Sequence, residues 1–182
     1  MPRFVRGALS FLVLLATTLV AVPQASGYPG EYWGHMRFRN AVTQTCLTLG
    51  SDEQALYLKP CQSIHPQEWW LTNQSSGADA YYEVFLPYSS PYKCLDAIWG
   101  HSTNAVNARP CDSSHHHPDQ EWLIRVIGGA TLIQSRSTGK YLGVDAEGWP
   151  RQFVSPADAR QGWPGATWCV RHTTDQTLCS PQ

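Results

Sequence analysis

Short runs in which apolar and polar residues alternate recur along this chain. The alternation is clearest at 55–59, 82–86 and 121–126, and clusters of Gly, Ser, Asn and Pro separate these runs. Side chains of a β-strand point alternately to its two faces, so the pattern predicts short strands joined by turns, whereas no stretch sustains a helical period. Several short strands at this spacing favour an all-β barrel or sandwich.

The alternating runs belong to a unit that occurs three times, at about 36–71, 82–126 and 131–170. The first two copies contain, in the same order, a Cys-Leu pair, a Pro-Cys pair and Gln-Glu-Trp. The third copy lacks this cysteine pair, has Lys-Tyr-Leu-Gly instead, and closes on Trp-Cys-Val. Three similar units, none able to bury its apolar face alone, imply closure around a pseudo-threefold axis.

Residues 1–27 have the pattern of a secretory signal peptide. Arg3 and Arg6 precede an apolar run at 11–22, and Ala25-Ser26-Gly27 offers the small residues that a signal peptidase reads. We therefore expect cleavage after Gly27 and an extracellular protein. The apolar run is short for a bilayer span, and no later segment is apolar enough to cross one.

The rest of the chain suits a single domain with its own core. We expect an N-terminal extension at 28–35, the repeat domain at 36–172 and a C-terminal tail at 173–182. The formal net charge of the whole chain is −1. Because no basic stripe is present either, nucleic acid is not an expected partner.

The cysteines favour disulfides over a metal site. All six follow residue 27, and an even number in a secreted chain is typical of a disulfide framework. Their spacings lack the paired Cys-x-x-Cys elements of structural zinc sites. His115-His116-His117 resembles a metal tract, but three consecutive side chains do not readily face one ion, and His117-Pro118 matches His65-Pro66 of the first copy. We expect neither a metal nor another cofactor.

The repeated order of Cys-Leu-Asp, Pro-Cys and Gln-x-Trp resembles the ricin-type β-trefoil lectin domain, over about residues 37–170. The resemblance implies an all-β fold, a single β-trefoil in which three units of four strands share a barrel core. It also implies sugar binding without chemistry. In plan the chain is similar, too, to the non-catalytic, ricin-like subunits of cytolethal distending toxins.

The repeat assigns roles to its tryptophans and cysteines. Bulky aromatic residues at equivalent positions of three units favour a shared core over a sugar site, so we predict that Trp69, Trp122 and Trp168 are core residues. The glutamine two residues before Trp69 and Trp122 is expected to tie a loop to the backbone. Matched intervals in the first two copies, with the remaining pair joined at the tail, predict the disulfides Cys46–Cys61, Cys94–Cys111 and Cys169–Cys179.

The resembled family binds sugar through an aspartate after Cys-Leu, a polar residue and a ring before the second cysteine, and an asparagine before the Gln-x-Trp glutamine. Only the second copy keeps the aspartate, as Asp96, since Thr48 and Gly143 replace it elsewhere. In the third copy Asp145, Trp149 and Gln152 lie nearby. The predicted carbohydrate-binding residues are Asp96, Asn107, Arg109, Asp119 and Gln120, with Trp99 and His101 from the intervening loop. The alternative for Asp96 is the capping of a turn.

The chain has no nucleophile motif, no paired-carboxylate signature and no zinc signature, so an enzyme is not expected. The predicted function is that of a secreted, non-catalytic, lectin-like protein whose partners are glycans or glycoconjugates. One alternative is a cell-binding or delivery subunit that binds other toxin subunits, because Trp33, Trp99 and Trp163 exceed what the core needs. A trefoil protease inhibitor is a further alternative.

Overall fold

A computed structural model describes residues 32–73, 80–98, 104–112, 117–127, 130–155 and 165–172. This part of the chain contains twelve β-strands and two short 3-10 helices, arranged in three consecutive units. The first unit comprises β1 (Tyr32–Asn40), β2 (Thr45–Leu49), β3 (Leu56–Pro60), η1 (His65–Gln67) and β4 (Trp69–Asn73). The second comprises β5 (Tyr81–Leu86), β6 (Lys93–Asp96), β7 (Asn107–Pro110), η2 (Pro118–Gln120) and β8 (Glu121–Ile127). The third comprises β9 (Ala130–Ser135), β10 (Tyr141–Val144), β11 (Pro150–Phe153) and β12 (Trp168–His172).

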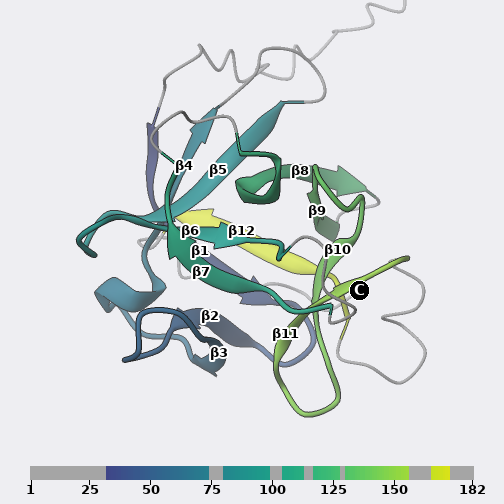
Figure 1. Cartoon of the computed structure of the whole chain (residues 1–182). Helices are drawn as coiled ribbons and strands as arrows, with labels where there is room; N and C mark the ends of the chain where they lie inside the picture. Colours follow the sequence, from purple (N-terminus) through teal and green to yellow (C-terminus); the bar gives the residue numbers. More distant parts are fainter. Residues whose placement is uncertain are drawn as a thin grey trace, which may run out of the picture.

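The first and last strands of each unit form a closed ring. Around it β1, β4, β5, β8, β9 and β12 each pair antiparallel with the next strand. The ring closes because β12 pairs with β1, with Phe38 opposite Val170 (Figure 1). A closed ring leaves none of these six strands with an unpaired edge. The expected all-β fold in three equivalent units is confirmed.

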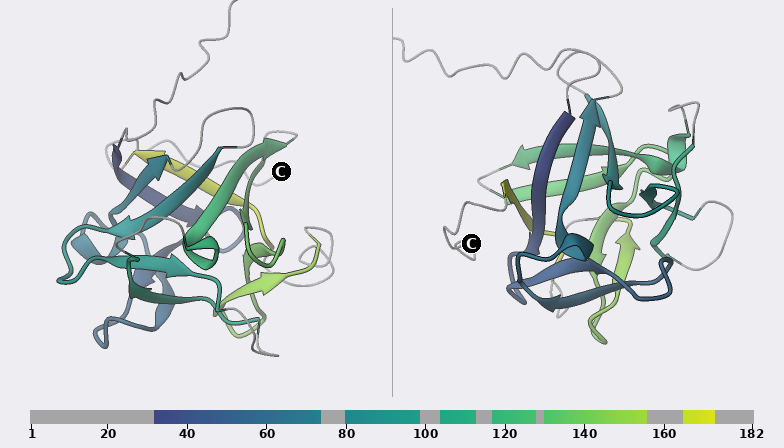
Figure 2. Two further views of the ribbon diagram at one scale, coloured as in Figure 1. Left: turned by 45° about the horizontal axis from the view of Figure 1, so that its top comes forward. Right: turned by 90° about the vertical axis from the view of Figure 1, so that its left-hand side faces the viewer.

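The two middle strands of each unit form a hairpin outside the ring: β2–β3, β6–β7 and β10–β11. The hairpins contact one another in a cycle. The amide of Ala108 donates to the carbonyl of Gln54 at 2.8 Å, and that of Gln152 donates to the carbonyl of Asn104 at 2.7 Å. Aromatic rings complete the cycle between the first and third hairpins, which lie side by side at the bottom of the right-hand view of Figure 2.

One buried tryptophan from each unit fills the barrel. Trp69, Trp122 and Trp168 all belong to the continuous hydrophobic core, as the repeat predicts. Each indole N–H donates to a leucine carbonyl on the second strand of its own unit, at 2.8–3.1 Å. A large aromatic ring is thereby buried with its polar group satisfied.

In each of the first two units, a disulfide links the second strand to the residue that follows the third strand. Cys46–Cys61 and Cys94–Cys111 are the pairs that the repeat predicts, with Cα–Cα distances of 5.0 and 4.9 Å. Cys169 is also disulfide-bonded, and its predicted partner Cys179 lies outside the described residues.

The ends of the predicted domain organisation lie partly outside the described residues. These include the expected signal peptide at 1–27 and the tail at 173–182. β1 begins at Tyr32, inside the segment 28–35 that was expected to precede the domain. Among the described residues, none forms a helix of the length and apolar character needed to cross a bilayer.

Candidate functional site

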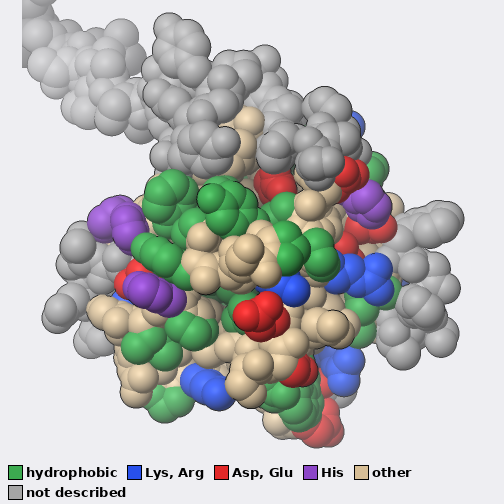
Figure 3. Space-filling model, turned by 60° about the vertical axis from the view of Figure 1, so that its left-hand side comes forward, with side chains coloured by type: hydrophobic (Ala, Val, Ile, Leu, Met, Phe, Trp, Pro, Cys, Tyr) green, Lys and Arg blue, Asp and Glu red, His purple; other side chains and the backbone are tan. Residues whose placement is uncertain are grey.

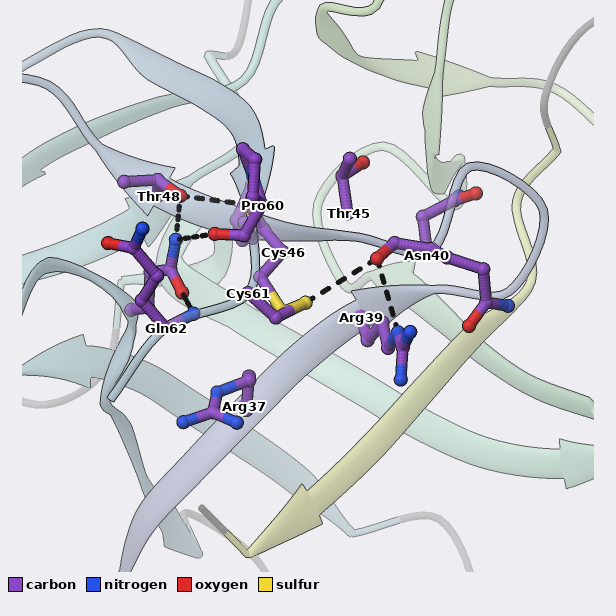
Figure 4. Close-up of a disulfide and its surroundings, with 12 residues drawn as sticks. Arg37, Arg39, Asn40, Thr45, Cys46, Thr48, Pro60, Cys61 and Gln62 are labelled. Carbon is purple, nitrogen blue, oxygen red and sulfur yellow. Dashed lines mark hydrogen bonds between the residues drawn. A yellow bond between two sulfur atoms is a disulfide. The ribbon is translucent and has the colours of Figure 1, made fainter. Parts of the chain in front are cut away.

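The hydrogen bonds from the three tryptophan indoles identify equivalent positions in the three units. Each indole donates to a leucine carbonyl, and the residue that follows this leucine is Thr48 in the first unit, Asp96 in the second and Gly143 in the third. In the first unit, the amide nitrogen of Gln67 donates to Thr48 Oγ1 at 2.9 Å and to the carbonyl of Pro60 at 3.0 Å. Its oxygen accepts the Gln62 amide at 2.7 Å, and Figure 4 shows Thr48, Pro60 and Gln62 gathered around these bonds beside the disulfide.

Gln120 makes the same bridge in the second unit, with a carboxylate in place of the hydroxyl. Its amide nitrogen donates to Asp96 Oδ2 and to the carbonyl of Pro110, both at 3.1 Å, and its oxygen accepts the Asp112 amide at 2.9 Å. The glutamine therefore ties the loop before η2 to the hairpin. It also fixes one oxygen of Asp96 in place.

The other oxygen of Asp96 has no hydrogen-bond partner among the described residues, although the residue is only 2% exposed. Arg109 Nε lies 3.9 Å from this Oδ1, and the Arg109 side chain is half exposed. Burial raises the pKa of Asp96, and the Gln120 hydrogen bond and the Arg109 charge offset part of that rise. A buried carboxylate oxygen normally has a donor, so this atom has unused hydrogen-bonding capacity.

The predicted polar residues gather around Asp96. Asn107 is its cross-strand partner in β6–β7, and Arg109 stands opposite Cys94, two residues along. Residues directly opposite in antiparallel strands share a face, so these side chains project to the same side of the hairpin. Asp119 lies next to the end of β6, because its backbone carbonyl accepts a hydrogen bond from the Ala97 amide at 2.8 Å. Trp99 and His101, predicted to line the same pocket, lie outside the described residues.

The third unit contains a ring that sequence reasoning missed. Phe153 stands opposite Tyr141 in the third hairpin. Arg109 holds the equivalent position in the second hairpin, opposite Cys94, and Lys59 holds it in the first, opposite Cys46. A Cβ on Gly143 would lie 2.6 Å from the Phe153 ring, so the ring occupies the space next to the missing carboxylate. In the first two units the second cysteine marks this position in the sequence. The third unit lacks that cysteine, so only the strand register identifies Phe153 as the equivalent residue.

Gln152, which the sequence placed near the third pocket, has another role. Its amide donates to the carbonyl of Ala105 at 3.0 Å and its oxygen accepts the Thr138 hydroxyl at 2.6 Å. It therefore joins the second and third hairpins. The three pockets are thus unequal. The second has the carboxylate and, among the described residues, no ring; the third has the Phe153 ring without the carboxylate; and the first has Thr48 in place of the carboxylate, with Tyr57 directly opposite it.

No protein-family model matches this sequence, and no curated protein matches it either. Solved structures do match. A designed three-fold symmetric protein, ThreeFoil, superimposes with a TM-score of 0.59 at 17% identity, over 76% of this chain and 96% of that one. The BEL β-trefoil gives a TM-score of 0.57 at 12% identity, over 75% and 90%. This chain is a β-trefoil.

The β-trefoil is also similar to a chain of the Haemophilus ducreyi cytolethal distending toxin. The TM-score is 0.60 at 14% identity, and the match covers 79% of the present chain and 86% of the toxin chain. At such identities the likeness concerns the fold. What this β-trefoil binds has to be argued from its own side chains.

Proposed function

We propose that this β-trefoil is a secreted, non-catalytic carbohydrate-binding protein, and that its second unit holds the sugar. The observation that carries the proposal is the second oxygen of Asp96. It is a rigidly held anionic acceptor whose hydrogen-bonding capacity no described residue uses. A sugar binds to fixed acceptors through its hydroxyl groups, and charge-assisted hydrogen bonds of this kind are the strong ones.

Arg109 determines how a sugar would reach that oxygen. Its half-exposed side chain stands over Asp96, where the resembled family has a stacking ring. A sugar that displaces the guanidinium sideways gains donors from it, and Asn107 on the same face offers both a donor and an acceptor. This arrangement favours an acidic or heavily hydroxylated sugar over one recognised by its apolar face.

The test is a glycan array probed with the full chain, followed by calorimetry on a glycan that binds. Asp96→Asn removes the charge but keeps an acceptor for Gln120, which suits a buried position better than alanine. We expect the variant to lose on the order of 1.5–3 kcal/mol of binding free energy. Arg125→Gln, which removes an exposed charge of β8, should bind as the wild type does. Equal affinity of Asp96→Asn and wild type would exclude this pocket.

A second candidate function is that of a delivery subunit in a secreted multi-subunit toxin. An exposed aromatic face supports it: Tyr88 and Tyr92 are 45% and 56% exposed, and His65 stacks on Tyr88 at 3.9 Å. Figure 3 shows hydrophobic side chains gathered beside histidines on one face of the molecule. The array separates the two candidates, because a subunit that works through its aromatic face and has no working sugar pocket binds no glycan by itself.

A further inference from the structure

We propose a second carbohydrate site, formed by Tyr57 and Trp149 where the first and third hairpins meet, that takes a neutral pyranose. The proposal rests on the proposed function in treating the chain as a sugar-binding protein. It shares no residue with the pocket at Asp96. Tyr57 comes from β3, and Trp149 stands just before β11. Their ring centroids lie 5.1 Å apart with an angle of 50° between the planes.

Trp149 is an exposed ring on a rigid turn. The side chain is 42% exposed. Asp145 holds the turn from both sides, because its Oδ1 accepts the Trp149 amide at 2.6 Å and its own amide donates to the Trp149 carbonyl at 2.9 Å. Gly148 takes a φ of 86°, which glycine adopts without strain. The backbone that carries the ring is therefore held before any ligand arrives, which limits the entropy lost on binding.

Tyr57 is fixed in a similar way. A Cβ on Gly50 would lie 2.5 Å from a carbon of the Tyr57 ring, so the ring packs directly on the glycine backbone. The two rings come from units at opposite ends of the sequence and meet because the hairpins close their cycle. Together they make a small aromatic platform with one well-exposed member.

Charged side chains lie near the two rings along their own hairpins. Lys59 Nζ lies 5.5 Å from the centroid of the Tyr57 ring. The half-exposed Arg151 side chain is held by Asp145, with 3.0 Å between Nε and Oδ2. Glu147 is exposed on the same turn as Trp149. Asp52 lies beside Tyr57 as well, because a Cβ on Gly50 would be 2.9 Å from its Oδ1. Three carboxylates thus accompany the two cations Lys59 and Arg151.

This combination fits a neutral pyranose better than a protein partner. A pyranose has an apolar C–H face that stacks on an indole and a rim of hydroxyls that bond to nearby charged groups. A stable protein interface needs a buried area of about 800 Å² on each partner, far beyond two rings. The small excess of carboxylates gives no preference for an acidic sugar, in contrast to the pocket beside Arg109.

The test follows the indole N–H of Trp149 by nuclear magnetic resonance in the ¹⁵N-labelled full chain, with the signal assigned through Trp149→Phe. The probes are methyl β-D-galactopyranoside and methyl β-D-glucopyranoside, with glycerol at the same concentration as a control that has hydroxyls but no ring. We expect at least one glycoside to shift the Trp149 signal in a saturable way. Trp149→Ala should weaken binding of that glycoside about tenfold, measured on the remaining signals near Tyr57.

Two further variants complete the design. Trp149→Phe keeps a stacking ring and should retain part of the affinity. Val154→Ala changes another exposed apolar residue of the third unit, 72% exposed, and should bind as wild type. The proposal is overturned if neither glycoside shifts the Trp149 signal, if glycerol shifts it equally, or if Trp149→Ala keeps wild-type affinity.

These outcomes are separable from those of the proposed function. If a glycan on the array loses affinity through Asp96→Asn and neither glycoside shifts the Trp149 signal, the Asp96 pocket stands and the aromatic site is overturned. If the glycosides bind at Trp149 and Asp96→Asn changes nothing on the array, the reverse holds. If no glycan binds on the array and no glycoside shifts Trp149, both proposals fail.

Discussion

Thr48 and Asp96 stand at the same position of two units and accept a hydrogen bond from equivalent glutamines. The hydroxyl of Thr48 satisfies Gln67 without bringing a charge into the protein. The fold therefore has no need of a carboxylate at this position, yet Asp96 carries one at 2% exposure. A buried charge that folding does not require is the kind of group that binding sites retain.

The effect of Asp96 on stability should depend on pH. Burial raises its folded-state pKa above the ordinary value of 3.8, so between the two values the folded protein holds a proton that the unfolded chain has lost. The free energy of unfolding then falls as the pH rises through that window. At neutral pH Asp96→Asn should be more stable than wild type.

Denaturant unfolding of both proteins at several pH values checks this prediction. The advantage of Asp96→Asn should shrink as the pH falls towards 3.8, because the wild-type side chain becomes neutral as well. Comparing variant with wild type at each pH cancels the titration of other groups. A difference that does not change with pH, or a variant less stable at neutral pH, contradicts the expected burial of a charge.

At the scale of the element, each hairpin fills the same space differently. The second uses Asp96 and Gln120, the first uses Thr48 and Gln67, and the third packs the Phe153 ring against Gly143. The third arrangement is apolar and depends on the absence of a side chain at Gly143. A hairpin of the same shape is thus stabilised by a hydrogen-bonded amide in two units and by a ring in the third.

Gly143→Ala should destabilise the protein by about 1–3 kcal/mol, the usual range for overpacking. The added methyl group would meet the Phe153 ring at 2.6 Å and approach the Ala166 Cα at 3.4 Å. A double-mutant cycle tests the cause. In a Phe153→Leu background the same Gly143→Ala change should be less destabilising, measured by denaturant unfolding. An equal effect in both backgrounds would mean that the ring is not what excludes the methyl group.

The sequence predicts those parts of the molecule that the units repeat. The three tryptophans, two of the disulfides and the strands follow from matched local spacings, since each unit solves the same packing problem. The position of Phe153 could not be predicted, because the third unit lacks the cysteines that mark its register. The contact of Tyr57 with Trp149 could not be predicted for another reason: the two residues belong to different units, and only closure of the whole fold brings them together.

At the scale of the whole molecule, the two described disulfides lie within units and not between them. Cys46–Cys61 and Cys94–Cys111 close loops of similar length, with sequence separations of 15 and 17 residues. Each therefore restricts the unfolded state of one hairpin, while the barrel and the hairpin cycle hold the units together.

Replacing either cysteine pair by alanine should lower the free energy of unfolding by about 3 kcal/mol, because loops of this length lose similar amounts of entropy when closed. The two losses should be close to additive, since the disulfides lie in different units. Denaturant unfolding of the two double variants and of the quadruple variant checks both points. A large departure from additivity would show that the hairpins stabilise each other through the disulfides.

The pairing of β1 with β12 also determines when the barrel can close during synthesis. β1 leaves the ribosome early, but one of its two barrel neighbours is the last strand of the described chain, so one edge of β1 stays bare while the intervening strands are made. At ordinary rates of synthesis that interval is on the order of ten seconds. The first two hairpins complete their own pairings during that time, whereas the bare edge stays open to pairing with other chains until Trp168–His172 arrives.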